Sequence, residues 1–252
     1  MKETDKNDFD NRPIGFFDSG VGGLTVLDKV KELLPNEKFI YFGDTKHMPY
    51  GEKTEQELLV YADEIFKFFE GQNVKAVVMA CNTTSAVTYE KLKNNYSFKI
   101  YPIIQTVANV LANMKLNCIG IFATPATINS HCYSKQILSR NPNLQVVEIA
   151  CKNWVKFVEN SKLDTVECRM AVKEKLDEMM KFNPEKIVLG CTHYPYLMDL
   201  LTEFLNKDKF IDPSIYFAKA IKEDLTQNNI LTNENIIKNC EFFVKVLTLV
   251  KI

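Results

Sequence analysis

The sequence has no excess of charge of either sign and no long hydrophobic run. Its 252 residues contain 31 Lys and Arg against 32 Asp and Glu, a net charge of −1, so we expect no nucleic-acid partner. No segment approaches the roughly 18 apolar residues of a membrane-spanning helix, and residues 1–12 are charged and lack the apolar core of a signal peptide. We therefore expect a cytoplasmic protein with no membrane partner and a disordered tail over residues 1–13.

Cysteines and glycines form none of the familiar motifs either. The seven cysteines contain no CxxC pair, and an odd number suits free thiols in a reducing compartment better than a disulfide framework. The run DSGVGG at residues 18–23 is neither a Walker A loop nor a GxGxxG motif, although its backbone suits a small carboxylate. No arrangement of a glycine-rich loop and a lysine favours pyridoxal phosphate. We expect no disulfide and no cofactor.

What the sequence does contain is an alternation of short apolar runs with segments of helical periodicity. Runs such as residues 14–17 and 76–80 predict buried strands, the pattern over 242–250 predicts a last strand, and residues 195–205 are expected to form a helix. TEQE at 54–57 and DTVE at 164–167 predict capping boxes, and the first of these helices is expected to close with Gly71 just beyond its end. Strands that alternate with helices predict the fold class α/β, with mainly parallel sheets covered on both faces.

One pattern occurs twice, each time around a cysteine. Cys81 follows the apolar run 76–80, and Cys191 follows the run 186–190; both precede hydroxyl-bearing residues. Each cysteine is therefore expected at a strand-to-helix turn, at the N-terminus of the helix. The repetition predicts two half-sites that face each other. Ligands of parallel sheets bind at the carboxyl ends of strands. The residues expected there are Asp18, Asp44, Cys81, Thr124 and Cys191.

Two thiols in one cleft suit the removal and return of a proton on carbon. A weakly acidic C–H bond needs a strong base that is not heavily solvated, and the pKa of a cysteine, about 8.5 when free, falls at a helix N-terminus. If Cys81 and Cys191 lie on opposite faces of one carbon, one takes the proton and the other returns it from the opposite side. The product is the mirror image of the substrate, and no cofactor is required in principle.

Plainer interpretations and other chemistries stay open. Cysteine is usually a buried packing residue. We expect that role for Cys118, Cys132, Cys151, Cys168 and Cys240. A zinc site from Cys81, Cys191 and His193 lacks a fourth ligand, so no metal is expected. A Cys-His-Asp nucleophile from Cys191, His193 and either Asp18 or Asp44 leaves Cys81 unexplained. His193 also suits a purely structural role.

Four segments, in this order, resemble the cofactor-independent aspartate/glutamate racemase family. They are DSGVGGLTV at 18–26, GDT at 43–45 with PYG at 49–51, CNT at 81–83 and GCTHYP at 190–195. The resemblance implies interconversion of L- and D-glutamate, which supplies D-glutamate for peptidoglycan. It also implies two pseudo-symmetric α/β domains with the active site in the cleft between them, commonly in a homodimer.

The resemblance also implies domain bounds and residue roles. Residues 14–104 and 213–252 would form the first domain and residues 105–212 the second. Cys81 would act on D-glutamate and Cys191 on L-glutamate. Asp18 and His193 would assist the thiols, with Glu159 supporting His193. The residues expected to bind glutamate are Ser19, Asp44, Pro49, Tyr50, Gly51, Asn82, Thr83, Thr124, Thr127 and Thr192.

Two further functions remain open at this point. One is a decarboxylase or isomerase of the same group, against which the two intact cysteine motifs count. The other is a non-catalytic protein whose cleft closes on an amino acid. Loss of optical rotation from L-glutamate without an added cofactor would separate these functions.

Overall fold

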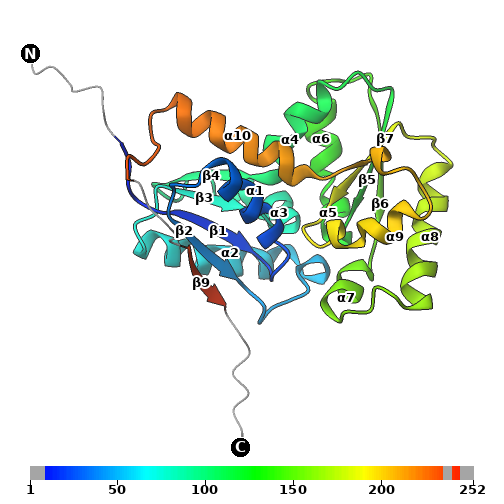
Figure 1. Ribbon diagram of the computed structural model, residues 1–252, viewed down its shortest axis with the longest axis horizontal. Helices are drawn as coiled ribbons and strands as arrows, with labels where there is room; N and C mark the ends of the chain where they lie inside the picture. Colours follow the sequence, from blue (N-terminus) through cyan, green and yellow to red (C-terminus); the bar gives the residue numbers. More distant parts are fainter. Residues whose placement is uncertain (1–8, 235–239, 245–252) are drawn as a thin grey trace, which may run out of the picture.

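The computed structural model describes residues 9–234 and 240–244 (Figure 1). Residues 1–8 of the expected tail lie outside the described residues. The rest of that tail is ordered, which corrects the expected bound at residue 13. The N–H of Asp10 donates to the carbonyl of Leu231, and the carbonyl of Pro13 accepts from the N–H of Lys75.

Two separate parallel sheets organise the chain. The first has the strand order β4-β3-β1-β2-β9, and the second has the order β6-β5-β7-β8. Every strand pair in both sheets is parallel. The strands of the first sheet are β1 (Ile14–Asp18), β2 (Phe39–Gly43), β3 (Ala76–Met79), β4 (Lys99–Pro102) and β9 (Cys240–Val244). Those of the second are β5 (Cys118–Ala123), β6 (Gln145–Ala150), β7 (Lys186–Gly190) and β8 (Phe210–Ile211).

The two sheets share one topology. Read from the opposite edge, the second sheet runs β8-β7-β5-β6, which matches β4-β3-β1-β2 strand for strand. In each sheet the chain first adds a strand on one side of its starting strand and then crosses to the other side. The point of crossing, between β1 and β3 or between β5 and β7, is where ligands of open parallel sheets bind. The sequence repeat around Cys81 and Cys191 therefore reflects a repeat in the fold, as predicted.

Helices and short 3-10 turns connect the strands. The α-helices are α1 (Leu24–Leu33), α2 (Glu55–Gly71), α3 (Asn82–Leu92), α4 (Ile103–Ala112), α5 (Pro125–Ser130), α6 (Cys132–Leu138), α7 (Trp154–Glu159), α8 (Val166–Met180), α9 (Met198–Thr202) and α10 (Pro213–Gln227). The 3-10 helices are η1 (Tyr50–Glu52), η2 (Tyr194–Leu197) and η3 (Lys207–Lys209).

Capping chemistry explains where the longer helices begin and end. Thr54 and Glu57 form the predicted reciprocal capping box of α2. At α8 the cap is Thr165, whose hydroxyl accepts from the N–H of Cys168, so the helix begins one residue later than predicted and the predicted capping box does not form. Gly71 is the last residue of α2 rather than the residue beyond it, and Asn73 takes the left-handed conformation instead, with φ of 52°. Asparagine tolerates this conformation better than most residues.

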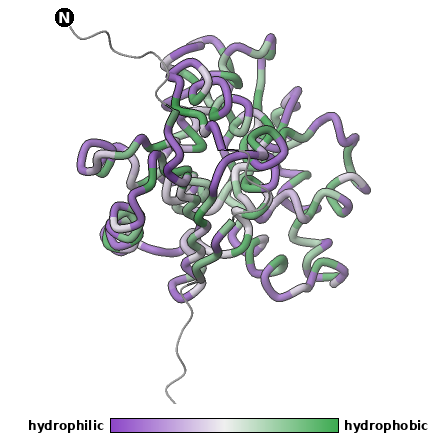
Figure 2. Tube along the Cα trace, turned by 60° about the vertical axis from the view of Figure 1, so that its left-hand side comes forward, coloured by the Kyte–Doolittle hydropathy of each residue, from purple (hydrophilic) through white to green (hydrophobic). Residues whose placement is uncertain are grey.

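Three apolar clusters form the core. One packs α2 on the outer face of the first sheet, and another packs α8 on the outer face of the second. The third lies between the sheets and contains buried residues of β1, α4, β5 and α10, such as Phe16, Leu111, Ile121 and Phe217. The two halves therefore share a hydrophobic core on one side. In Figure 2 the outer turns of the chain are largely hydrophilic, as expected for loops around such a core.

A buried ion pair fixes the return of the chain to the first sheet. Lys75 Nζ lies 2.6 Å from Glu37 Oε2, with side chains only 1% and 2% exposed. The same ammonium donates to the carbonyls of Asp10 and Ile230. Helix α10 crosses from the second sheet back to the first (Figure 1), and the loop after it is held by this pair. These extra hydrogen bonds offset part of the cost of burying two charges.

The last strand begins earlier than expected. β9 covers Cys240–Val244 and pairs with β2. The sequence pattern predicted a strand over residues 242–250, and the last six of these lie outside the described residues.

Cysteines 118, 132, 151 and 168 are buried free thiols, as expected for packing residues, and Cys240 is half-buried. Within residues 9–234 and 240–244, no helix has the length and apolar character needed to cross a membrane.

Candidate active site

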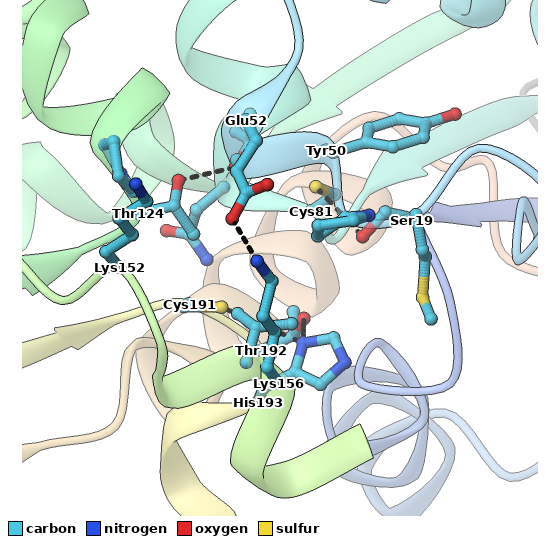
Figure 3. A pocket seen from close by; sticks show the side chains of 17 residues that line it. Ser19, Tyr50, Glu52, Cys81, Thr124, Lys152, Lys156, Cys191, Thr192 and His193 are labelled. Atoms are coloured by element: carbon cyan, nitrogen blue, oxygen red, sulfur yellow. Dashed lines mark hydrogen bonds and ion pairs between the residues drawn. The ribbon is translucent and has the colours of Figure 1, made fainter. Parts of the chain in front are cut away.

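Residues that follow β1, β3, β5 and β7 line one cavity. Ser19 and Cys81 come from the crossing point of the first sheet, and Thr124 and Cys191 come from that of the second. Figure 3 shows the two cysteine side chains reaching this cavity from different strands. The full lining is Ser19, Met48, Pro49, Tyr50, Gly51, Glu52, Cys81, Asn82, Thr83, Thr124, Pro125, Lys152, Val155, Lys156, Cys191, Thr192 and His193.

Cys81 lies in a buried, electronegative environment. It is the N-cap residue of α3, as predicted, and its thiol donates to Ser19 Oγ at 3.7 Å. Burial raises the pKa of the Cys81 thiol to about 11, and the nearby carboxyl of Asp18 acts in the same direction. At neutral pH Cys81 is therefore a thiol, ready to donate a proton. The expectation of a lowered pKa at this helix N-terminus is wrong, because desolvation outweighs the helix.

Cys191 has a different local structure and a different partner. The expected helix N-terminus is absent: a turn follows Cys191, then the 3-10 helix η2, and α9 begins only at Met198. Pro195 has no N–H for the intrahelical ladder, so it suits this tight first turn. The sulfur of Cys191 lies 3.8 Å from Nδ1 of His193. The predicted helix over 195–205 is therefore split in two and shorter.

His193 carries a positive charge next to Cys191. Its other nitrogen, Nε2, is hydrogen-bonded to the carboxylate of Glu159, as the resemblance implied. Burial lowers the pKa of His193, but the hydrogen bonds with Cys191 and Glu159 outweigh burial and raise that pKa to about 10. His193 is thus an imidazolium at neutral pH. The two thiols therefore have unequal neighbours, a cation beside Cys191 and a carboxyl near Cys81.

Asp18 lies behind the cavity and touches both halves of the site. It is fully buried and is not part of the lining. Its Oδ2 accepts from the N–H of Gly20 at 3.0 Å, and its Oδ1 accepts from the hydroxyl of Thr192 at 3.2 Å. Burial raises the pKa of Asp18, although His193 and these donors oppose the shift. The glycine loop thus presents the N–H of Gly20 to its own Asp18, and the use of the loop for a substrate carboxylate stays a prediction.

Two glycines allow the two halves to approach each other closely at the site. A Cβ on Gly22 would lie 2.6 Å from Thr192 Oγ1 and 2.7 Å from His193 Nδ1, and one on Gly51 would lie 2.6 Å from Cβ of Thr124. No glycine in the described part of the chain has a positive φ. Gly22 and Gly51 therefore matter because they have no side chain, and not because of an unusual backbone conformation.

Polar side chains from the two halves are hydrogen-bonded to each other in the cavity wall. Thr83 Oγ1 lies 2.9 Å from Thr124 Oγ1, which lies 3.0 Å from Thr127 Oγ1. The hydroxyl of Tyr133 donates to Asn82 Oδ1 at 2.7 Å. Thr127 is outside the cavity lining and its hydroxyl contacts that of Thr124, which lines it; direct substrate binding by Thr127 stays a prediction. These contacts fix the orientation of the hydroxyl groups before a ligand binds.

Asp44 also acts from behind the cavity wall. It does not line the cavity, and its Oδ2 accepts from the hydroxyl of Tyr50 at 2.6 Å and contacts Nδ1 of His47 at 2.7 Å. His47 in turn stacks on Tyr61, with ring centroids 3.9 Å apart. Asp44 thus holds the Tyr50 hydroxyl through Oδ2, whereas its buried Oδ1 has no hydrogen-bond partner among the described residues; substrate binding by Asp44 stays a prediction. Pro49, Tyr50 and Gly51 do line the cavity.

Sequence reasoning missed several residues that line the cavity. They are Met48, Glu52, Pro125, Lys152, Val155 and Lys156. Lys156 Nζ and Glu52 Oε1 form an ion pair of 2.7 Å between the two halves, and a motif-based search has no signal for it. In the described part of the chain, no three His, Cys, Asp or Glu side chains are grouped to hold a metal ion, so the zinc alternative has no ligand set there.

The chain is similar to known racemases over most of its length. Residues 15–220 match the Asp/Glu/hydantoin racemase family. The chain is 39% identical over 237 residues to the glutamate racemase of Thermoanaerobacter pseudethanolicus, covering 93% of this chain and 88% of that protein. It is 40% identical over 219 residues to the glutamate racemase of Carboxydothermus hydrogenoformans, covering 86% and 82% of the two chains.

Solved structures show the same architecture. The glutamate racemase of Francisella tularensis, solved in complex with D-glutamate, superimposes with a TM-score of 0.89 at 36% identity, covering 96% of this chain and 90% of that one. The Escherichia coli glutamate racemase, solved with L-glutamate and an activator, superimposes with a TM-score of 0.75 at 26% identity, covering 94% and 91%. The overall fold is therefore shared with these proteins.

Proposed function

The chain belongs to the Asp/Glu/hydantoin racemase family, and from this premise we propose that it interconverts L- and D-glutamate by two-thiol proton transfer at the α-carbon. The observation that carries this proposal is the position of the two cysteines. Cys81 and Cys191 follow equivalent strands of two sheets with one topology, and both line the same cavity. The relatives with glutamate bound support glutamate as the substrate.

The unequal surroundings of the thiols suggest how a reaction cycle starts. Cys191, beside the imidazolium of His193, takes the α-proton of L-glutamate, and Cys81, a thiol at neutral pH, delivers a proton to the opposite face. The C–H electron pair passes through a planar carbanion and forms the new C–H bond. Afterwards Cys191 is protonated and Cys81 is not, so the same arrangement in reverse converts D-glutamate to L-glutamate.

Uncharged polar groups in the cavity wall, both donors and acceptors, suit a zwitterionic amino acid. We assign contact with the substrate to lining residues with hydroxyl, amide or exposed backbone groups. These are Ser19, Pro49, Tyr50, Gly51, Asn82, Thr83, Thr124 and Thr192. Asp18, Asp44, Thr127 and Glu159 act through Thr192, Tyr50, Thr124 and His193 respectively, since they bond to those groups rather than line the cavity.

The wider setting is also a proposal. We propose that the protein acts in the cytoplasm as a homodimer and supplies D-glutamate for peptidoglycan, as the family resemblance implies. We also propose that residues 14–104 with 213–252 act as one domain and residues 105–212 as the other. The division of the two sheets along the chain supports this assignment.

The direct test follows the optical rotation of pure L-glutamate in the presence of the protein, with a metal chelator and no added cofactor. We expect the rotation to fall to zero while the amount of glutamate stays constant, and D-glutamate to reach the same end point. Loss of glutamate with release of carbon dioxide would instead indicate a decarboxylase. Unchanged rotation despite measurable glutamate binding would contradict the proposal and favour a non-catalytic binding protein.

A further inference from the structure

Three charged side chains lie along the same cavity as the cysteines and are not needed for proton transfer. They are Glu52, Lys152 and Lys156. Lys156 is paired with Glu52, with side chains 48% and 34% exposed. Lys152 has no carboxylate partner among the residues that the structure describes. The three groups together carry one net positive charge, whereas the whole chain carries a net charge of −1.

The Glu52–Lys156 pair joins the two halves across the cavity. Glu52 ends η1, which follows β2 of the first sheet, and Lys156 lies on α7, which follows β6 of the second. Figure 3 shows the dashed line of this pair crossing the view between Cys81 and Cys191. Helix α7 is held firmly by Trp154, whose ring packs 5.0 Å from the rings of both Phe122 and Tyr194. Trp154 thus anchors the start of the helix that carries Lys156.

We propose that Lys152 and Lys156 are specificity-determining residues that select a dicarboxylic amino acid over neutral amino acids; this inference rests on the proposed function. A dicarboxylic amino acid carries one more negative charge than a neutral amino acid of the same shape. Lys152 attracts that charge, and the ammonium group of Lys156 exchanges its ion pair with Glu52 for one with a substrate carboxylate. The exchange is easy because partly exposed ion pairs are weak. Both lysines line the same cavity, so together they add positive charge that attracts an anionic substrate.

Removing each positive charge should weaken glutamate binding selectively. We expect Lys152→Met and Lys156→Met each to raise the KM for L-glutamate about fivefold to tenfold, with kcat changed less than about twofold, because uniform binding is lost. Glu52→Gln should lower the KM about twofold, since Lys156 is then released. Lys173→Met is the matched control. Lys173 is also an exposed, ion-paired lysine, but it lies on α8 outside the cavity lining. The KM of the Lys173→Met variant for L-glutamate should therefore equal that of the parent.

Three further measurements separate charge from shape. Lys156→Arg keeps the charge and should retain the parental KM. The inhibition constant of L-glutamine, which is neutral overall, should stay within about twofold in every variant. The salt dependence of kcat/KM should flatten in the double methionine variant. The proposal is overturned if both methionine variants keep the parental KM, if Lys156→Arg is as impaired as Lys156→Met, or if glutamine binding weakens as much as glutamate binding.

The same assays keep this inference apart from the proposed function. The parent protein is assayed first with L-glutamate. An inactive parent contradicts the proposed function, and the inference fails with it. An active parent whose methionine variants are unchanged contradicts only the role of the lysines.

Discussion

Replacing either Cys81 or Cys191 with serine is expected to reduce kcat/KM for glutamate at least about 1,000-fold in both directions. Every turnover uses one thiol as base and the other as acid, and a positioned acid or base contributes about 100- to 10,000-fold. A serine hydroxyl is a far weaker acid than a thiol, so it does not replace either function. The loss must be equal in both directions, because two enantiomers have equal free energy in water and their equilibrium constant is one.

Cys118→Ser is the matched control for the cysteine variants. Cys118 is a buried free thiol at the amino end of β5, the end opposite to Thr124 and the cavity. Its sulfur contacts the carbonyl of Phe182 at 3.6 Å, and a serine hydroxyl can keep that contact. We expect its activity to stay within about twofold of the parent. Full racemisation by Cys81→Ser or by Cys191→Ser would exclude the two-thiol mechanism.

The second large effect is expected at His193. His193→Asn should reduce kcat/KM by about 100-fold or more, since it removes the imidazolium beside the sulfur of Cys191. His131→Asn is the control: the His131 side chain is 61% exposed, lies outside the cavity lining and pairs with Glu148. We expect that variant to match the parent. Equal activity in all three proteins would assign His193 a structural role only.

The pH profile gives His193 a signature that a folding defect does not produce. The pKa of His193 is about 10, so the imidazolium is present below that pH and is lost as the pH rises through it. In the parent, kcat/KM should therefore fall as the pH rises through about 10. The amino group of the substrate also loses its proton in the alkaline range, in the parent and in the variant alike. The part of the decrease in kcat/KM that the His193→Asn variant does not show is due to deprotonation of His193.

Sequence reasoning succeeded where the signal is local. Buried strands such as β3 and β7 are continuous apolar runs, and the capping box of Thr54 and Glu57 is a four-residue pattern. Both depend on neighbours along the chain. The motifs around Cys81 and Cys191 were found for the same reason, because each follows one of these strands directly.

Sequence reasoning failed where the outcome depends on three-dimensional surroundings. The direction of the Cys81 pKa shift depends on burial and on Asp18, which are features of the folded site. The pairing of Glu52 with Lys156 depends on how the two halves are placed, and neither residue belongs to a motif. The hydrogen bonds of Asp44 Oδ2 with Tyr50 and His47 likewise depend on the folded loop and have no sequence motif.

The most direct test of two-thiol racemisation is the isotope content of the first product formed in heavy water. L-Glutamate loses its α-proton to one thiol, while the other thiol, already equilibrated with solvent, delivers deuterium to the opposite face. At early times we expect nearly all D-glutamate to carry deuterium at Cα and the remaining L-glutamate to stay largely protiated. D-Glutamate that retains the original proton at early times would show that a single group moves the proton between faces, and it would contradict the account.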